Sequence, residues 1–132
     1  VFVGAYIYRG IALVTELVKL KERVADADLV ITGEGRLDET TFRDKAVMGV
    51  GEIVKSVAIE RDRVGQLYVV AVCGSVDRYN RFTAGKHLDG IYKSYRKPRI
   101  PMIEVERSGE AHLIAATQKA FGDYLQRRLR MS

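Results

Sequence analysis

The stretch DLVITGEGRLDETTFRDKAVMGVG, residues 28–51, decides the fold of this chain. It sets a short apolar run, residues 29–32, directly before a loop that holds two glycines and several charged residues, and an amphipathic segment follows. Apolar runs of this length bounded by glycine are typical of buried strands, and α/β enzymes present charged groups where such strands end. The stretch therefore predicts a strand at 29–32, a charged loop, and a helix at about 42–59.

The flanking sequence repeats this alternation of strand and helix. Apolar residues recur at helical spacing from Gly10 to Val24, which predicts one amphipathic helix. The apolar run 67–72 predicts a second strand, the weaker run 90–95 predicts a third, and Ser108 is expected to cap a long final helix. Buried strands that alternate with amphipathic helices indicate the α/β class, here a Rossmann-like parallel sheet with flanking helices.

Length and composition indicate one soluble domain. The chain has 132 residues, of which 47% are hydrophobic and 30% charged, and this suits a globular core. No apolar run reaches the roughly 18 residues of a membrane helix, and the start lacks the basic leader of a signal peptide. The single cysteine, Cys73, excludes an internal disulfide and is expected to be a buried thiol in a reducing cytoplasm. Three strands are few, so we expect residues 1–132 to form one Rossmann-like segment, an incomplete half of a larger domain.

The charged loop carries the main candidates for chemistry. In an extended loop, Glu34, Arg36 and Asp38 point to one side, and they gather two carboxylates and a guanidinium. Such a set suits a small hydroxy acid. Arg36 can hold the substrate carboxylate in a two-point contact. A neighbouring carboxylate can orient or deprotonate the attacking hydroxyl, or help to hold a magnesium ion.

The residues around this loop favour an anion site. Gly33 and Gly35 allow positive φ and let a ligand approach the backbone closely. The hydroxyl of Thr41, the side chain of Lys45 and the first amides of the following helix suit a phosphate group. A simpler interpretation also fits: a solvated salt-bridge loop, followed by a helix cap made by Thr41 and Asp44.

Residues 28–51 also closely resemble the ADLVITGEGR-D-Q-T-GK-P-GVA signature of the bacterial-type glycerate kinases. Residues 71–77, AVCGSVD, resemble the A-AGS turn of that family, whereas the last forty residues match poorly in detail. The resemblance implies a kinase that phosphorylates glycerate with ATP and magnesium, in a cleft between a Rossmann-like domain and an inserted α/β domain. It covers the C-terminal portion of the family's length, without the N-terminal part that holds a DSFKG-type motif and without the inserted domain.

Carried over position by position, the resemblance implies roles for residues of this sequence. The catalytic candidates are Asp38 and Glu34, and no metal ligand is assigned. The binding candidates are Arg36 and Lys45 for the substrate, and Gly33, Gly35, Thr41, Gly74 and Ser75 for the nucleotide or its phosphates.

Three positions depart from the family signature. Thr40 stands where the family has Gln, Asp44 where it has Gly, and Val47 where it has Pro. The negative charge of Asp44 beside Lys45 opposes phosphate binding.

The sequence leaves two other functions open. One is a divergent remnant without activity that serves as a binding or structural module. The other is a nucleic-acid binder, suggested by the net charge of +5 and by cations at 93–99 interleaved with Tyr92 and Tyr95, although no known nucleic-acid motif surrounds them. His87 and His112 lack partners at zinc-ligand spacing. Because so few strands leave apolar edges exposed, we expect a homo-oligomer or pairing with an N-terminal segment.

Overall fold

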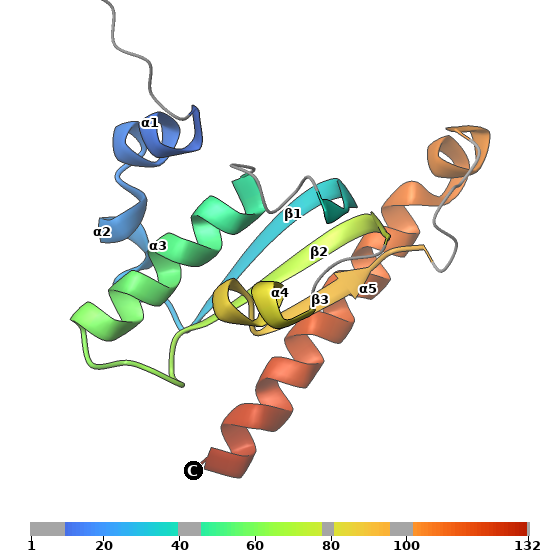
Figure 1. The fold of residues 1–132 in the computed structure, drawn as a ribbon. Coiled ribbons are helices and arrows are strands. Elements are labelled where there is room, and N and C mark those ends of the chain that lie inside the picture. Colours follow the sequence, from blue (N-terminus) through green and yellow to red (C-terminus); the bar gives the residue numbers. More distant parts are fainter. Residues whose placement is uncertain (1–9, 40–45, 78–80, 96–101, 132) are drawn as a thin grey trace, which may run out of the picture.

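The structure of the chain is a computed structural model that describes residues 10–39, 46–77, 81–95 and 102–131. Its centre is a parallel sheet with helices on both faces (Figure 1), which confirms the predicted α/β class. The strands, in spatial order, are β1 (Leu29–Leu37), β2 (Tyr68–Val76) and β3 (Gly90–Lys93). The helices are α1 (Gly10–Leu17), α2 (Leu20–Val24), α3 (Ala46–Glu60), α4 (Arg81–His87) and α5 (Met102–Met131).

The register of the strands brings the ends of β1 and β2 together. Leu29 lies opposite Tyr68, and Leu37 lies opposite Val76, so the two strands run side by side over their full length. One residue past the strands, the backbone N–H of Asp77 donates to the carbonyl oxygen of Leu37 at 2.9 Å. The carboxyl ends of both strands therefore form one edge, where ligands bind in open α/β sheets.

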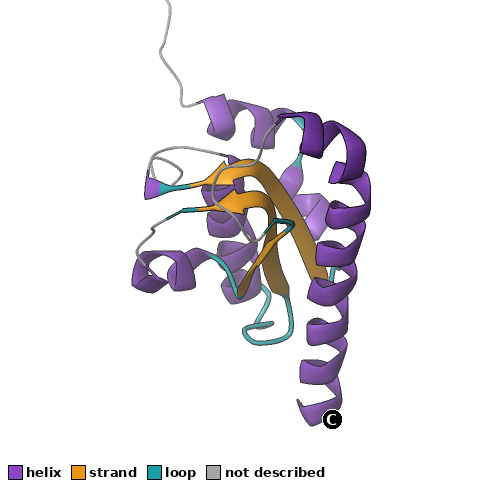
Figure 2. Cartoon of the chain, turned by 90° about the vertical axis from the view of Figure 1, so that its right-hand side faces the viewer, coloured by secondary structure: helices purple, strands orange, loops and turns teal. Residues whose placement is uncertain are grey.

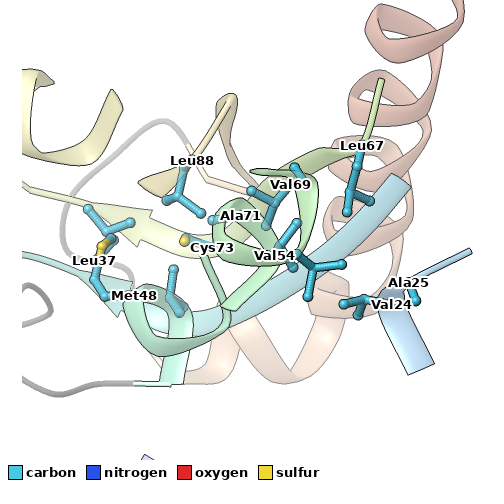
Figure 3. Packing of buried hydrophobic residues seen from close by; sticks show 13 residues of the cluster. Val24, Ala25, Leu37, Met48, Val54, Leu67, Val69, Ala71, Cys73 and Leu88 are labelled. Carbon is cyan, nitrogen blue, oxygen red and sulfur yellow. The ribbon is translucent and has the colours of Figure 1, made fainter. Parts of the chain in front are cut away.

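One face of the sheet is covered by α3 and carries the larger core (Figure 3). Its most deeply buried side chains are aliphatic, apart from the thiol of Cys73. They are Leu37, Val47, Val54, Leu67, Val69, Ala71 and Cys73. Burying a Val or Leu side chain contributes about 1.5–3 kcal/mol each, so this layer supplies much of the folding free energy.

On the other face, α5 packs on β2 and β3, and it runs along the sheet in Figure 2. Ala116 and Ala120 of α5 are buried against Val70 and Val72 of β2. Small residues on the helix allow it to lie close to the β-branched side chains of the strand. None of the helices within the described ranges combines the length and the apolar character that crossing a membrane requires.

The first helix differs from the prediction. The single helix expected from Gly10 to Val24 is divided into α1 and α2, because Lys19 adopts the left-handed conformation with φ of 51°. That conformation cannot continue an α-helix. Val24 of α2 reaches the core, whereas Leu13 and Leu17 of α1 remain exposed.

The final helix begins earlier than predicted. Ser108 was expected to be its N-cap, but α5 starts at Met102 and Ser108 lies within it. Serine is tolerated inside a helix, although it prefers caps. The sequence cue that went unused is Pro101, because proline is common at helix starts.

The two glycines of α3 allow close packing, but not against the sheet. A Cβ at Gly49 would overlap Ile11 Cγ1, and one at Gly51 would lie 2.6 Å from the carbonyl oxygen of His87. The helix therefore contacts α1 and the end of α4 through positions where only glycine fits. Helix α4 was not predicted from the sequence.

Candidate active site at the carboxyl ends of β1 and β2

The structure gathers most of the described candidates at one edge of the sheet. Glu34 and Arg36 lie in the last half of β1, which continues to Leu37 and so includes most of the stretch predicted to be a loop. Asp38 follows directly. In the neighbouring strand, Ser75 is the register partner of Arg36. Thr41 and Lys45, with the proposed capping box, lie outside the described residues.

An ion-paired arginine is the centre of this edge. The Nη2 group of Arg36 donates to Oδ2 of Asp77 at 2.6 Å, and its Nε lies 3.7 Å from Oδ2 of Asp38. The Arg36 side chain remains 49% exposed. The salt bridges that the simpler interpretation expects are thus present. They leave the side chain of Arg36 accessible from solvent.

Asp77 is the site residue that the sequence interpretation missed. It follows the second strand by one residue, as Asp38 follows the first. A cue was available: two parallel neighbouring strands that each end before an Asp bring both carboxylates to one edge. The pairing with Arg36 could not be read from the sequence, because the two residues are separated by 41 positions.

Glu34 faces the α3 side of the sheet, next to Cys73. The two residues are register partners, and Cys73 belongs to the core beneath α3. Burial raises the pKa of the Cys73 thiol to about 11, and the nearby Glu34 carboxylate also raises it, whereas a backbone hydrogen bond from Glu34 lowers it. The thiol is therefore protonated at neutral pH, and the buried, free cysteine predicted from the sequence is confirmed.

Glycines at this edge are required by close contacts between the strands, which could not be predicted from the sequence. A Cβ at Gly33 would lie 2.8 Å from the carbonyl oxygen of Val72, and one at Gly74 would lie 2.5 Å from that of Gly35. Glycine is thus required for the approach of the two strands. Gly33 and Gly35 lie in the extended strand β1, and Gly65 is the glycine with positive φ among the described residues.

Unlike Gly33 and Gly74, Gly35 has open space where a side chain would project. A Cβ there would meet no atom within 4 Å. A ligand could approach the backbone at this position from the α5 side of β1, the face opposite to the one on which Arg36 projects.

The aromatic residues of the basic segment do not form a stacking surface. Tyr95 is buried, with its ring 4.5 Å from that of His112. The hydroxyl of Tyr92 donates to Oδ2 of Asp123 at 3.1 Å. Arg96, Lys97 and Arg99 lie outside the described residues. Nucleic-acid binding is therefore not favoured, because single strands bind to exposed aromatic faces.

No group of three or more histidine, cysteine, aspartate or glutamate side chains is arranged to hold a metal ion within the described ranges. His112 contacts Tyr95, and His87 Nδ1 lies 4.0 Å from Oε1 of Glu52. His112 thus takes part in packing, and His87 lies near a carboxylate.

Comparison with known proteins yields one family. The sequence model of the family described as "Glycerate kinase family" matches residues 1–124 of this chain. The glycerate kinase of Bacillus subtilis (strain 168) is 34% identical over 91 residues, which are 69% of this chain and 22% of that protein. The glycerate 2-kinase of Escherichia coli (strain K12) is 43% identical over 54 residues, or 41% of this chain and 14% of that protein.

A third relative gives the same result. The glycerate kinase of Neisseria meningitidis serogroup B is 41% identical over 75 residues, 57% of this chain and 18% of that protein. In these three relatives the match spans between 14% and 22% of their length.

Proposed function

Because this chain belongs to the glycerate kinase family, we propose that it forms one wall of a site where the γ-phosphoryl group of ATP is transferred to a hydroxyl of glycerate. The observation that carries the proposal is the group of Glu34, Arg36 and Asp38 at the carboxyl end of β1, beside the carboxyl end of the parallel strand β2. Within the proposal, residues 1–132 form a single Rossmann-like segment that corresponds to the C-terminal part of the enzyme. A cytoplasmic location belongs to the proposal, because ATP and a reducing environment for Cys73 are found there.

Arg36 is proposed to bind the carboxylate of glycerate. Its pairing with Asp77 is exposed, and exposed ion pairs contribute only about 0.2–1 kcal/mol. A bidentate, charge-assisted contact with a substrate carboxylate is worth more, about 1.5–3 kcal/mol. Glycerate can therefore bind one edge of the guanidinium while Asp77 or Asp38 remains paired with another edge.

Asp38 and Glu34 are proposed to act on the reacting hydroxyl. Asp38 lies beside Arg36, so a substrate whose carboxylate is bound there presents its hydroxyl groups to this carboxylate. Glu34 lies two residues earlier on the same strand, and its side chain is half-buried. A carboxylate within reach of the hydroxyl can orient it or accept its proton.

The phosphate groups are proposed to bind at this edge and at the start of α3. Gly33, Gly35, Gly74, Ser75 and Thr41 keep their proposed parts in nucleotide binding, and Lys45 keeps its proposed part in substrate binding.

The residues present fit ATP bound with magnesium. Magnesium in kinases is held by one or two carboxylates together with phosphate oxygens and water. Asp38 and Glu34 supply that number of carboxylates, so the absence of a larger ligand cluster in the described residues is no obstacle. The metal, when bound, neutralises charge on the phosphates.

A chimera tests the proposal. In it, this chain replaces the matching segment of the Bacillus subtilis relative, and glycerate-dependent release of ADP is measured. We expect turnover above background that falls when Asp38 is replaced by Asn. A folded chimera that binds ATP but shows no glycerate-dependent turnover would count against the proposal.

A further inference from the structure

Two carboxylates from neighbouring strands lie beside the guanidinium of Arg36. Asp38 follows β1, and Asp77 follows β2. The backbone holds Asp77 in this place, because its N–H donates to the carbonyl oxygen of Leu37 at 2.9 Å. Replacing the side chain of Asp77 therefore changes the charge beside Arg36 and leaves the hydrogen bond between the two strand ends intact.

Both contacts involve one edge of the guanidinium. Asp77 accepts a hydrogen bond from Nη2 at 2.6 Å, and Oδ2 of Asp38 lies 3.7 Å from Nε. Within the described part of the chain, neither contact involves Nη1 of Arg36. Since a guanidinium carries five N–H donors, Nη1 and the second hydrogen of Nη2 can bind one carboxylate at two points. Arg36 thus has an edge for one substrate carboxylate and none for a second.

The two carboxylates outnumber the guanidinium. Asp38 and Asp77 contribute two negative charges and Arg36 one positive charge, so these three residues leave an excess of negative charge. A substrate carboxylate that binds Arg36 uses the remaining edge of its guanidinium. A second carboxylate on the same small molecule lies close to Asp77 or Asp38 and is repelled. This arrangement therefore suits hydroxy acids with one carboxylate and disfavours dicarboxylates.

Asp77 is better suited than Asp38 to act in this selection alone. Asp38 is proposed to act on the reacting hydroxyl, whereas Asp77 has no part in the proposed chemistry. The contact of Asp77 with Arg36 is the shorter of the two, and 41% of the Asp77 side chain is exposed. Its charge therefore lies beside the guanidinium and faces the solvent from which a substrate enters.

We propose that Asp77 is a specificity-determining residue, which restricts this site to hydroxy acids with a single carboxylate because it repels a second one. The inference rests on the proposed binding of the glycerate carboxylate by Arg36. Repulsion of the wrong ligand is a common source of specificity. In a partly exposed site, one unit charge a few ångströms away changes the affinity for an anion about tenfold.

Binding of two matched acids tests the proposal. 2-Hydroxymalonate has a second carboxylate where glycerate has a hydroxymethyl group, so the two acids differ chiefly in charge. Their dissociation constants are measured by calorimetry with the chimera of this chain and the Bacillus subtilis relative, without and with Asp77→Asn. We expect the unaltered chimera to bind glycerate more tightly by about tenfold or more. In Asp77→Asn, the Kd of 2-hydroxymalonate should fall about tenfold more than that of glycerate.

Three controls separate charge from shape. Asp62→Asn removes a negative charge before the start of β2, at a residue whose φ of 53° asparagine tolerates, and it should leave the preference unchanged. Asp77→Glu keeps the charge and should keep the preference. At about 1 M salt the Debye length is only about 3 Å, so the preference of the unaltered chimera should become smaller, whereas that of Asp77→Asn should change little.

The outcomes for this inference and for the proposed function are distinct. The inference is overturned if the unaltered chimera binds both acids equally, or if Asp77→Asn shifts the preference no more than Asp62→Asn does. Selective binding that Asp77→Asn relaxes, without turnover of glycerate, supports the inference and contradicts the proposed phosphoryl transfer. Binding of neither acid also overturns the inference, because Arg36 then does not bind the carboxylate. If Asp77→Asn does not fold, Asp77→Ser removes the same charge and is measured in its place.

Discussion

Replacing Arg36 by Lys keeps the positive charge at the carboxyl ends of the strands but removes the planar, two-point contact that a guanidinium offers. Arg36 makes one short bond, 2.6 Å to Asp77, and a longer contact of 3.7 Å to Asp38. Its exposed surface is where a substrate carboxylate would bind. The substitution therefore separates two interpretations of Arg36: a substrate clamp and a surface ion pair.

The two interpretations predict effects of different size. Loss of a bidentate contact with glycerate removes about 1.5–3 kcal/mol, which lowers kcat/KM about ten- to hundredfold. Loss of the exposed pair with Asp77 removes at most about 1 kcal/mol, which shifts the melting temperature by about 5 °C or less in a domain of this size. Kinetics should thus change strongly and stability only slightly.

Asp77→Asn is the matched control, because it breaks the same ion pair from the other side and leaves the guanidinium in place. We expect this variant to lose as little stability as Arg36→Lys and to retain binding of glycerate. Removal of a negative charge beside Arg36 favours an anionic substrate, so KM should stay equal or fall. Steady-state kinetics of both variants in the chimera, with melting curves of the isolated chain, provide the measurement. The clamp is refuted if Arg36→Lys leaves kcat/KM unchanged, or if Asp77→Asn impairs it equally.

Three other predictions concern the same chain. Asp38→Asn in the chimera should lower kcat more than it raises KM, because a group that acts on the hydroxyl matters most in the transition state; an effect confined to KM would contradict this. The isolated chain should show little kinase activity, since phosphoryl transfer depends on positioning both reactants, and glycerate-dependent turnover of about 1 per second or more would disprove it. Because the pKa of Cys73 is raised to about 11, its contribution to stability is present below about pH 9 and is lost as the pH rises toward 11. Melting temperatures across that range should fall more for the unaltered chain than for Cys73→Ala, and parallel curves would argue against the raised pKa.

The sequence predicted the parallel α/β sheet because its two main strands are continuous apolar runs, a pattern that burial on both faces requires. It placed the end of the first strand too early, because the glycines and charges of 33–36 are typical of loops. The structure keeps them in β1, where Gly33 allows close approach to Val72. Local composition cannot reveal such a contact, since its partner lies on another strand.

Two further differences between the prediction and the structure also arise from tertiary contacts. The helical spacing from Gly10 to Val24 is continuous in sequence, yet Lys19 takes a left-handed conformation that lets α2 reach the core. Asp77 has no local feature that marks it as the partner of Arg36. In both cases the structure depends on tertiary contacts, whereas spacing and capping rules describe only neighbours along the chain.

The exposure of the candidate site matters for the proposed reaction. Arg36 is accessible from solvent, and Gly35 has open space beside its backbone. Transfer of a phosphoryl group requires a site that excludes water and holds both reactants in line. An edge of the three-stranded sheet among the described residues cannot enclose both reactants, because β1, which carries Glu34 and Arg36, has a neighbouring strand on one side alone. The proposed reaction therefore requires a second wall opposite Arg36, which agrees with our expectation that the isolated chain shows little kinase activity.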